Sequence, residues 1–221
     1  MLHLPQSFQT ANKALLVKHL YYKLRFSLPI GLLYKLFHWR NVSGLIFIGP
    51  STEIWYPKLF TAGRNCFLGS QGKLNALSRN GVRFGSRVTL GDRFWVQGTS
   101  YLNDLGDALI LEDGVYIGPN AILGFHGRVF IGKNTAIGAN FQLSAQSHNL
   151  DNLENVSHSV SPSLGITIGE GCWFGNDVKV LDGVSVGKFS VIGAGSVITR
   201  SIPDYSVAVG SPAKVIRSRH A

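Results

Sequence analysis

Large apolar residues recur at every sixth position in the second half of the chain. These positions are Ile168, Phe174, Val180, Val186, Ile192 and Ile198. An amphipathic helix needs apolar residues three or four positions apart, and a single strand alternates over a short run only. A period of six that is kept over six repeats predicts short parallel strands joined by similar corners. Such strands form a solenoid whose interior is filled by these apolar residues.

The residues around each apolar position support this interpretation. Glycine follows four of the six apolar residues, and glycine permits the tight backbone that a corner needs. Four positions after each apolar residue the chain has a second small or aliphatic residue, from Cys172 to Ile202. We therefore expect both positions of each repeat to point inward.

The same period occurs upstream in other phases. Its members are Ile131, Ile137 and Leu143; Leu105, Leu111, Ile117 and Leu123; and Phe84, Leu90, Val96 and Leu102. A weaker group contains Ile48, Ile54 and Phe60, and for the Ile48 group we favour an ordinary strand with a glycine turn. The phase changes within 61–83, 102–105, 123–131 and 143–168, where we expect bulges or loops. The longest polar interruption covers 144–165, and loops on a rigid scaffold commonly carry function.

Composition and charge narrow the class of protein. Of the 221 residues 26 are glycine, which the repeat explains. Cys66 and Cys172 lie far apart, so neither a disulfide scaffold nor a metal site is predicted, and Cys172 occupies an inward position. The net charge of +9 favours an anionic partner, but no nucleic-acid-binding module is visible. We find no signal peptide and no apolar run of about 18 residues, and therefore expect a cytoplasmic protein.

The pattern predicts three segments. Residues 1–43 lie outside the repeat and contain an expected helical region, Ala11 to Trp39, in which basic and apolar residues are interleaved. We expect this region to cap the first coil, because an open solenoid end is an exposed strand edge. A basic element that contacts an anionic membrane is the alternative. Residues 44–203 are expected to form the solenoid, with the active site on loop 144–165, and residues 204–221 a C-terminal tail.

Four motifs in the second half of the chain resemble one family. They are Ser147 to Asp151, Ile168 to Asn176, Ile192 to Arg200, and Gly210 to Ile216. Together they resemble the hexapeptide-repeat O-acetyltransferases, near the maltose, galactoside and nodulation-factor acetyltransferases and the related polysaccharide O-acetyltransferases. The resemblance is close from about residue 111 to 217, loose before that, and absent in residues 1–43.

This resemblance implies a fold and a reaction. The fold is all-β: a left-handed parallel β-helix, here with an N-terminal α-helical segment. The left hand comes from the family alone, because spacing does not define handedness. The family forms homotrimers with active sites between adjacent subunits. The reaction transfers acetyl from acetyl-CoA to a hydroxyl group of a sugar or polysaccharide.

The resemblance also implies the residues of the site. His148 is the expected general base, because a sugar hydroxyl must lose a proton as it attacks the thioester, and a neutral imidazole accepts one near neutral pH. Direct transfer needs no acyl-enzyme. His126, Asp151 and Glu154 are expected acceptor-binding residues. An aspartate is more typical at the position of His126, so both an acceptor contact and a structural corner stay open for this residue.

A second set is expected to bind the donor. The residues that match the family's cofactor groove are Trp173, Asn176, Ala194, Thr199, Arg200, Lys214 and Arg217. Trp173 would pack against the pantetheine arm, and basic residues would hold the phosphates. Arg200 stands where lysine is usual, which keeps the charge but changes its geometry.

Two other functions remain open at this point. One is N-acetylation of an amino sugar nucleotide, and the other is a non-catalytic trimeric solenoid. A zinc enzyme with this repeat needs three suitably spaced histidines, and the chain has no such set around His126 and His148.

Overall fold

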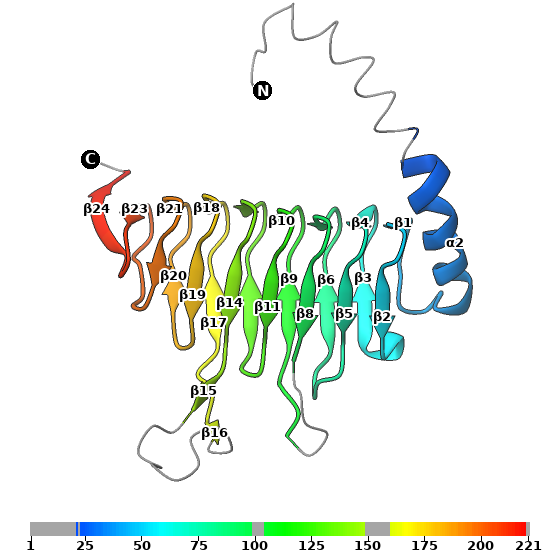
Figure 1. Cartoon of the computed structure of the whole chain (residues 1–221), viewed down its shortest axis with the longest axis horizontal. Coiled ribbons are helices and arrows are strands. Elements are labelled where there is room, and N and C mark those ends of the chain that lie inside the picture. Colours follow the sequence, from blue (N-terminus) through cyan, green and yellow to red (C-terminus); the bar gives the residue numbers. More distant parts are fainter. Residues whose placement is uncertain (1–20, 22, 99–103, 149–159, 220–221) are drawn as a thin grey trace, which may run out of the picture.

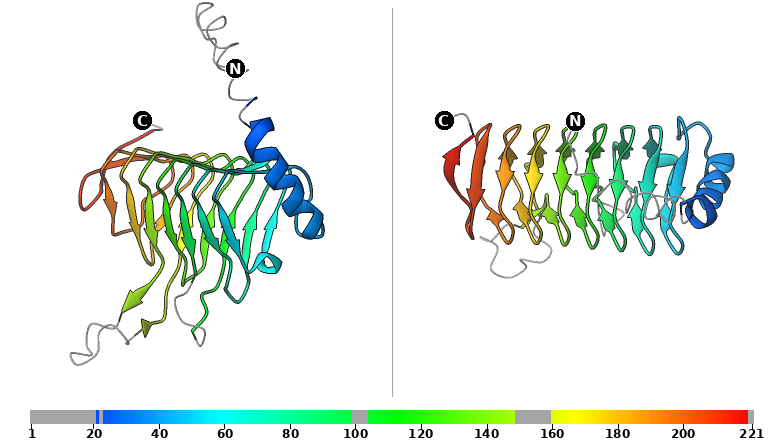
Figure 2. Two further views of the ribbon diagram at one scale, coloured as in Figure 1. Left: turned by 45° about the vertical axis from the view of Figure 1, so that its right-hand side comes forward. Right: turned by 90° about the horizontal axis from the view of Figure 1, so that it is seen from above.

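The structure is a computed structural model that describes residue 21 and residues 23–98, 104–148 and 160–219. Within these residues the strands form the three faces of a parallel solenoid, with a helix at one end and a hairpin at the other (Figures 1 and 2). The fold class expected from the sequence, a left-handed parallel β-helix with an N-terminal helical segment, is confirmed.

The chain visits the three faces in the same order in every coil. The first face contains β1 (Ile46–Ile48), β4 (Cys66–Leu68), β7 (Thr89–Leu90), β10 (Tyr116–Ile117), β13 (Ala136–Ile137), β18 (Trp173–Phe174), β21 (Val191–Ile192), β23 (Ser206–Val209) and β24 (Lys214–Ser218). The second face contains β2 (Glu53–Trp55), β5 (Lys73–Asn75), β8 (Trp95–Gln97), β11 (Ile122–Gly124), β14 (Gln142–Ser144), β19 (Lys179–Leu181) and β22 (Val197–Ile198). The third face contains β3 (Phe60–Ala62), β6 (Val82–Phe84), β9 (Leu109–Leu111), β12 (Val129–Ile131), β17 (Ile166–Ile168) and β20 (Ser185–Val186).

The core is built from the positions that the repeat predicts. All six apolar residues from Ile168 to Ile198 are buried, and so are the residues four positions after each of them. The alternation within one strand shows why: in β12, Val129 and Ile131 point inward while Phe130 is only partly buried. Side chains of successive coils stack on one another, as Phe141 does edge-on against Phe174 at 5.7 Å between ring centroids.

Two sequence interpretations at the edges of the pattern need correction. Leu105 is only half-buried, because it lies on an excursion of the chain that returns to the third face at β9. Leu102 lies outside the described residues. The ordinary-strand interpretation of the Ile48 group is wrong, since β1, β2 and β3 form the first coil and pair with β4, β5 and β6. The period is weak there because the 3-10 helix η2 (Pro57–Leu59) lengthens a corner.

The corners explain the glycines and several polar residues. At the corner between the first and second faces, a Cβ on Gly175 would lie 2.6 Å from the backbone nitrogen of Ala194 in the next coil. At the same corner Asn120 and Asn140 adopt left-handed backbone, with φ of 61° and 59°. Their amides form a ladder along the axis, because Asn120 Nδ2 donates to Asn140 Oδ1 and Asn140 Nδ2 donates to Asp177 Oδ1, both at 2.9 Å.

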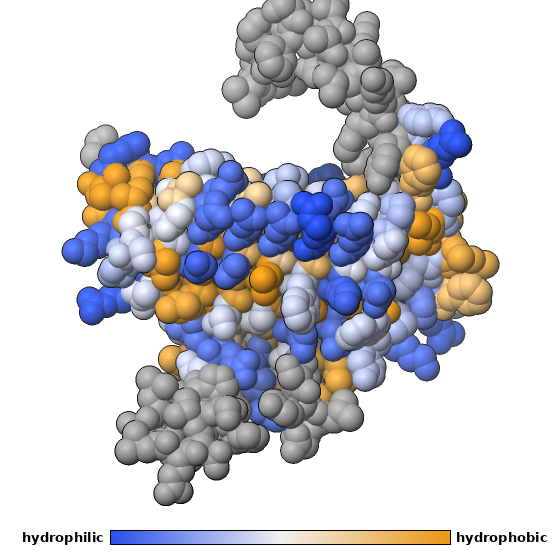
Figure 3. Space-filling model, in the orientation of Figure 1, coloured by the Kyte–Doolittle hydropathy of each residue, from blue (hydrophilic) through white to orange (hydrophobic). Residues whose placement is uncertain are grey.

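Each end of the solenoid is covered by a different element. The π-helical turn η1 (Lys23–Ser27) leads into α2 (Leu28–Phe37), which packs on β1 so closely that a Cβ on Gly31 would collide with the carbonyl oxygen of Ile46. At the other end β23 extends the first face beyond residue 203, and β24 pairs with it antiparallel. Exposed apolar side chains gather over both end elements (Figure 3). Among the described residues, no helix has the length and apolarity that a membrane span requires.

The corner between the second and third faces carries the interruptions of the repeat. After β8 the chain leaves this corner and returns at β9, and after β14 it leaves again and returns at β17. The second excursion contains the antiparallel pair β15 (Ser147–His148) and β16 (Val160–Ser161), which projects from the body of the solenoid (Figure 1). We call this corner the loop edge.

Candidate active site

His126 lies on the loop edge shortly after β11 and has a side-chain oxygen close to each ring nitrogen. Its side chain is 13% exposed, and its Nε2 lies 3.1 Å from Asp104 Oδ2. Its Nδ1 lies 3.1 Å from Ser163 Oγ. Arg79 Nη2 approaches the other oxygen of Asp104 at 3.9 Å. Two excursions of the chain therefore meet at this histidine, since Asp104 belongs to the first and Ser163 to the second.

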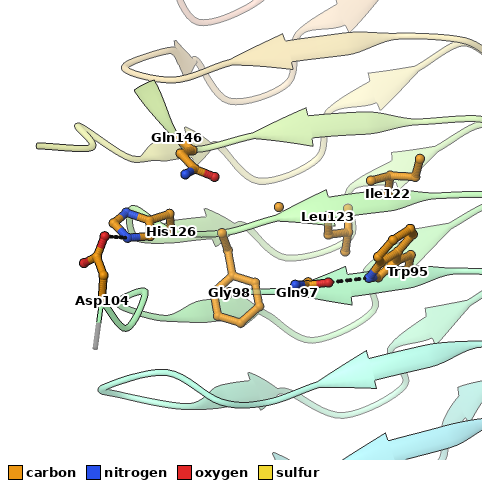
Figure 4. Close-up of a pocket in the computed structure, with 10 residues that line it drawn as sticks. Trp95, Gln97, Gly98, Asp104, Ile122, Leu123, His126 and Gln146 are labelled. Carbon is orange, nitrogen blue, oxygen red and sulfur yellow. Dashed lines mark hydrogen bonds and ion pairs between the residues drawn. The ribbon is translucent and has the colours of Figure 1, made fainter. Parts of the chain in front are cut away.

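A pocket of about 300 Å³ opens beside His126. Figure 4 shows Trp95 and Ile122 at one end of the pocket and His126 with Asp104 at the other, with Gln97 between them. The indole Nε1 of Trp95 donates to Gln97 Oε1 at 2.8 Å, which fixes the ring. This combination of an apolar wall and a few polar groups is typical of small-molecule sites.

A second cavity, of about 530 Å³, lies on the other side of the same histidine. It shares Asp104 and His126 with the first pocket and adds Arg79, Arg128 and Ser163. The second cavity lies at the loop edge, and the first extends from the loop edge onto the second face. His126 is thus a wall between an aromatic pocket and a charged one.

The strand that carries His148 is anchored to the solenoid by Asp182. Ser147 Oγ donates to Asp182 Oδ2 at 3.2 Å, and the backbone nitrogens of Leu164 and Gly165 donate to the same carboxylate at 3.0 and 2.8 Å. Asp182 therefore holds both arms of the second excursion at the loop edge. His148 lies in β15, opposite Val160 of β16. Asp151 and Glu154 lie outside the described residues.

The residues expected to bind the donor fall into two groups. Trp173, Asn176 and Ala194 line a cavity of about 340 Å³ together with Tyr116, at the corner between the first and second faces. Trp173 is 51% exposed, and Asn176 Oδ1 accepts a hydrogen bond from the Ala139 backbone nitrogen at 2.9 Å. We call this corner the groove edge.

The remaining donor residues lie elsewhere on the chain. Thr199 and Arg200 follow β22 on the loop edge, next to Leu181 and Asp182 of the preceding coil, and both are exposed. Lys214 and Arg217 are exposed on β24 at the end of the first face. Because the whole second face separates the two edges, one copy of the chain does not bring His148 and Trp173 to the same place.

Sequence reasoning missed several residues of the loop edge. Asp104 and Ser163 contact His126, and Trp95 and Gln146 line the pocket beside it. A signal existed for two of them: Asp104 falls within the phase change at 102–105, and Trp95 precedes an inward position and must therefore point outward. Nothing in the sequence pairs Ser163 with a histidine 37 residues earlier. No group of three or more His, Cys, Asp or Glu residues suited to a metal ion occurs within the described part of the chain.

The fold and the repeat together define the class of this protein. Residues 165–200 match the family described as bacterial transferase hexapeptide (six repeats). Over these residues the chain therefore carries the hexapeptide repeat of that family. Its likeness to the solved Arabidopsis UDP-N-acetylglucosamine acyltransferase supports the fold, with a TM-score of 0.58 at 13% identity over 81% of this chain and 64% of that one.

Two relatives in sequence have a more specific name, galactoside O-acetyltransferase. The chain is 36% identical over 130 residues to the galactoside O-acetyltransferase of Escherichia coli, and these cover 59% of the chain and 63% of that protein. It is 34% identical over 137 residues to the galactoside O-acetyltransferase of Lactococcus lactis, covering 58% of the chain and 61% of that protein. The match therefore spans less than two thirds of the length of these curated relatives.

Proposed function

We propose that the protein is an acetyl-CoA-dependent O-acetyltransferase that acts on a hydroxyl group of a sugar or polysaccharide. The observation that carries this proposal is the loop edge, where the His148 strand is anchored beside a pocket with an aromatic wall and a hydrogen-bonded histidine. The similarity to galactoside O-acetyltransferases supports the class of reaction.

His148 acts as the general base in this proposal. Its imidazole takes the proton of the acceptor hydroxyl as the hydroxyl oxygen bonds to the acetyl carbon. The carbon–sulfur bond of the thioester then breaks, the electron pair stays on sulfur, and the proton leaves His148 for the thiolate or for water. No acyl-enzyme is formed. Asp182 contributes by holding the arms of the excursion that carries His148.

The donor occupies the groove edge in this proposal. Acetyl-CoA supplies the activated acetyl group. The cavity of Trp173, Asn176 and Ala194 is open along one side and flanked by small residues, which suits an extended thioester arm. Lys214 and Arg217 on β24 present cations to the phosphates of the nucleotide end. Thr199 and Arg200 extend the donor site on the loop edge.

A homotrimer completes the site. The loop edge of one subunit and the groove edge of another meet when three prisms associate around a three-fold axis, which is a closed assembly with one kind of interface. Each active site then contains His148 from one subunit and Trp173 from its neighbour.

The reaction is tested by thiol release. The purified protein is mixed with acetyl-CoA and, in turn, with methyl β-galactoside, maltose, a polysaccharide and an amino sugar nucleotide. Thiol release with a hydroxyl acceptor supports the proposal. Release only with the amino sugar nucleotide identifies an N-acetyltransferase instead, and release with none of these acceptors favours the non-catalytic solenoid.

For the N-terminal segment we propose a capping role. Gly31 and Tyr34 of α2 face the first coil, and burial raises the pKa of the Tyr34 hydroxyl well above its ordinary value. Leu33, Leu36 and Phe37 point away from it and are exposed, which supports the alternative of contact with the cytoplasmic face of a membrane. Deletion of residues 1–43 separates the two roles. A cap predicts aggregation of the shortened protein, whereas a membrane element predicts a soluble, active trimer that no longer binds anionic vesicles.

A further inference from the structure

The second face carries exposed aromatic side chains that neither the base nor the donor site uses. Trp55 and Trp95 are 47% and 53% exposed, and Ile122 points outward in the next coil after Trp95. We propose that this face is a binding track for a glycan chain, so that the acceptor is an oligosaccharide or polysaccharide rather than a single sugar. This inference rests on the proposed function, because it assigns the acceptor of that same site.

Two cavities on this face share a wall. One is the pocket beside His126. The other, of about 270 Å³, is lined by Trp55, Gln71, Lys73 and Asn75. Trp95 and Gln97 line both cavities. The hollows therefore follow one another along the solenoid axis, with Trp95 between them and His126 at the end nearer the His148 strand.

The length of this track exceeds one sugar ring. Trp55 lies on β2 and Trp95 on β8, which are two coils apart in the second face. Neighbouring strands are about 4.8 Å apart, so the two indoles are separated by about 10 Å along the axis. His126 follows β11, a further coil away, which brings the track to about 14 Å. A monosaccharide held at His126 would not reach Trp55.

The chemistry of the side chains matches a saccharide. Each indole is fixed by a hydrogen bond from its Nε1 to a neighbouring side chain, Trp55 to Glu53 Oε2 at 3.0 Å and Trp95 to Gln97 Oε1 at 2.8 Å. A fixed aromatic face packs against the C–H face of a sugar, while amide groups such as Gln71, Asn75 and Gln146 can donate to and accept from its hydroxyls. A lipid chain would need a continuous apolar groove, and here amides interrupt the aromatic surface.

Binding is tested without acetyl-CoA, so that the result does not depend on catalysis. The full-length protein is titrated calorimetrically with β-1,4-galacto-oligosaccharides and malto-oligosaccharides of one to six units. In at least one series we expect the affinity to rise with chain length. It should level off at about four units, when the saccharide fills the track. Trp95→Ala should weaken binding of both the disaccharide and the hexasaccharide about tenfold. Trp55→Ala should weaken binding of the hexasaccharide and leave binding of the disaccharide unchanged.

Matched controls make the outcome decisive. Trp39→Ala removes an exposed indole away from the track and should change neither affinity. Equal affinity for all lengths, binding of no member of either series, or an unchanged hexasaccharide affinity in Trp55→Ala would each overturn the track. Dissociation of the oligomer by either variant, seen by light scattering, would show a subunit interface instead and would also overturn it. If thiol release with monosaccharides equals that with hexasaccharides, the proposed function stands and the track is wrong.

Discussion

His126 and His148 both lie on the loop edge, and we propose different roles for them. The two ring nitrogens of His126 each lie 3.1 Å from a side-chain oxygen, Nε2 from Asp104 and Nδ1 from Ser163. A general base needs a ring nitrogen within hydrogen-bond reach of the acceptor's proton. We propose His148 as the base because its motif, Ser147 to Asp151, carries the family resemblance, and we propose His126 as a positioned wall of the acceptor pocket.

Substitution of His148 tests this assignment. His148→Ala should lower turnover by roughly two to four orders of magnitude, the usual contribution of a general base, and leave the fold unchanged. The expected loop 144–165 contains a second histidine, His158, and His158→Ala is the matched control that should keep full turnover. His126→Asn should raise the KM for the acceptor more than it lowers kcat. Near-wild-type turnover of His148→Ala would contradict the assignment.

The two thiols give a prediction about pH. Burial raises the pKa of Cys66 and of Cys172 above the ordinary thiol value of 9.0. Because the folded state keeps the thiols protonated, their contribution to stability is full at neutral pH and is lost as the pH rises through the raised pKa. Both thiols should therefore resist Ellman's reagent at pH 8 in the native protein and react after denaturation. Rapid reaction of the native protein would show that a thiol is accessible.

At the scale of elements, the repeat predicts the coils but does not predict the contacts that the excursions make. Each inward position is repeated from coil to coil, so a single pattern indicates strand, corner and core from Ile168 to Ile198. The contacts of Asp104, Ser163 and Asp182 join segments that the repeat does not relate. The first coil departs from the pattern for the same reason, because η2 lengthens the corner between Ile54 and Ala62, the residue that aligns with Phe84 in the next coil.

The ladder at the groove edge is an element that can be tested by stability. Asn140 donates and accepts one hydrogen bond each within the ladder and has φ of 59°. Asn140→Ala loses both bonds and places an alanine in left-handed backbone, which should cost about 2 kcal/mol in the free energy of unfolding. Asn140→Gly loses the bonds but tolerates the backbone, and should cost about half as much. Chemical denaturation measures the free energy of unfolding of both variants. An equal loss of stability in the two variants would show that the left-handed backbone at residue 140 adds no cost for alanine.

At the scale of the whole molecule, the predicted site residues are divided between two edges of one prism. The motifs around His148 and Trp173 are only 25 residues apart in sequence, so their separation could not be read from spacing. The separation follows from the topology. His148 lies on the loop edge, where the second face meets the third, whereas Trp173 lies on the first face beside the groove edge. The account therefore requires that two subunits build each active site.

Mixed oligomers of two inactive variants test this requirement most directly. His148→Ala damages only the loop edge and Trp173→Ala only the groove edge. After the two are refolded together in equal amounts, one half of the loop edges and one half of the groove edges are intact, so about one quarter of the sites should regain activity. His148→Ala mixed with Arg200→Ala, which damages the same edge, should recover nothing. Recovery near one quarter in the first mixture is the result we predict, and no recovery above either variant alone would contradict a shared active site.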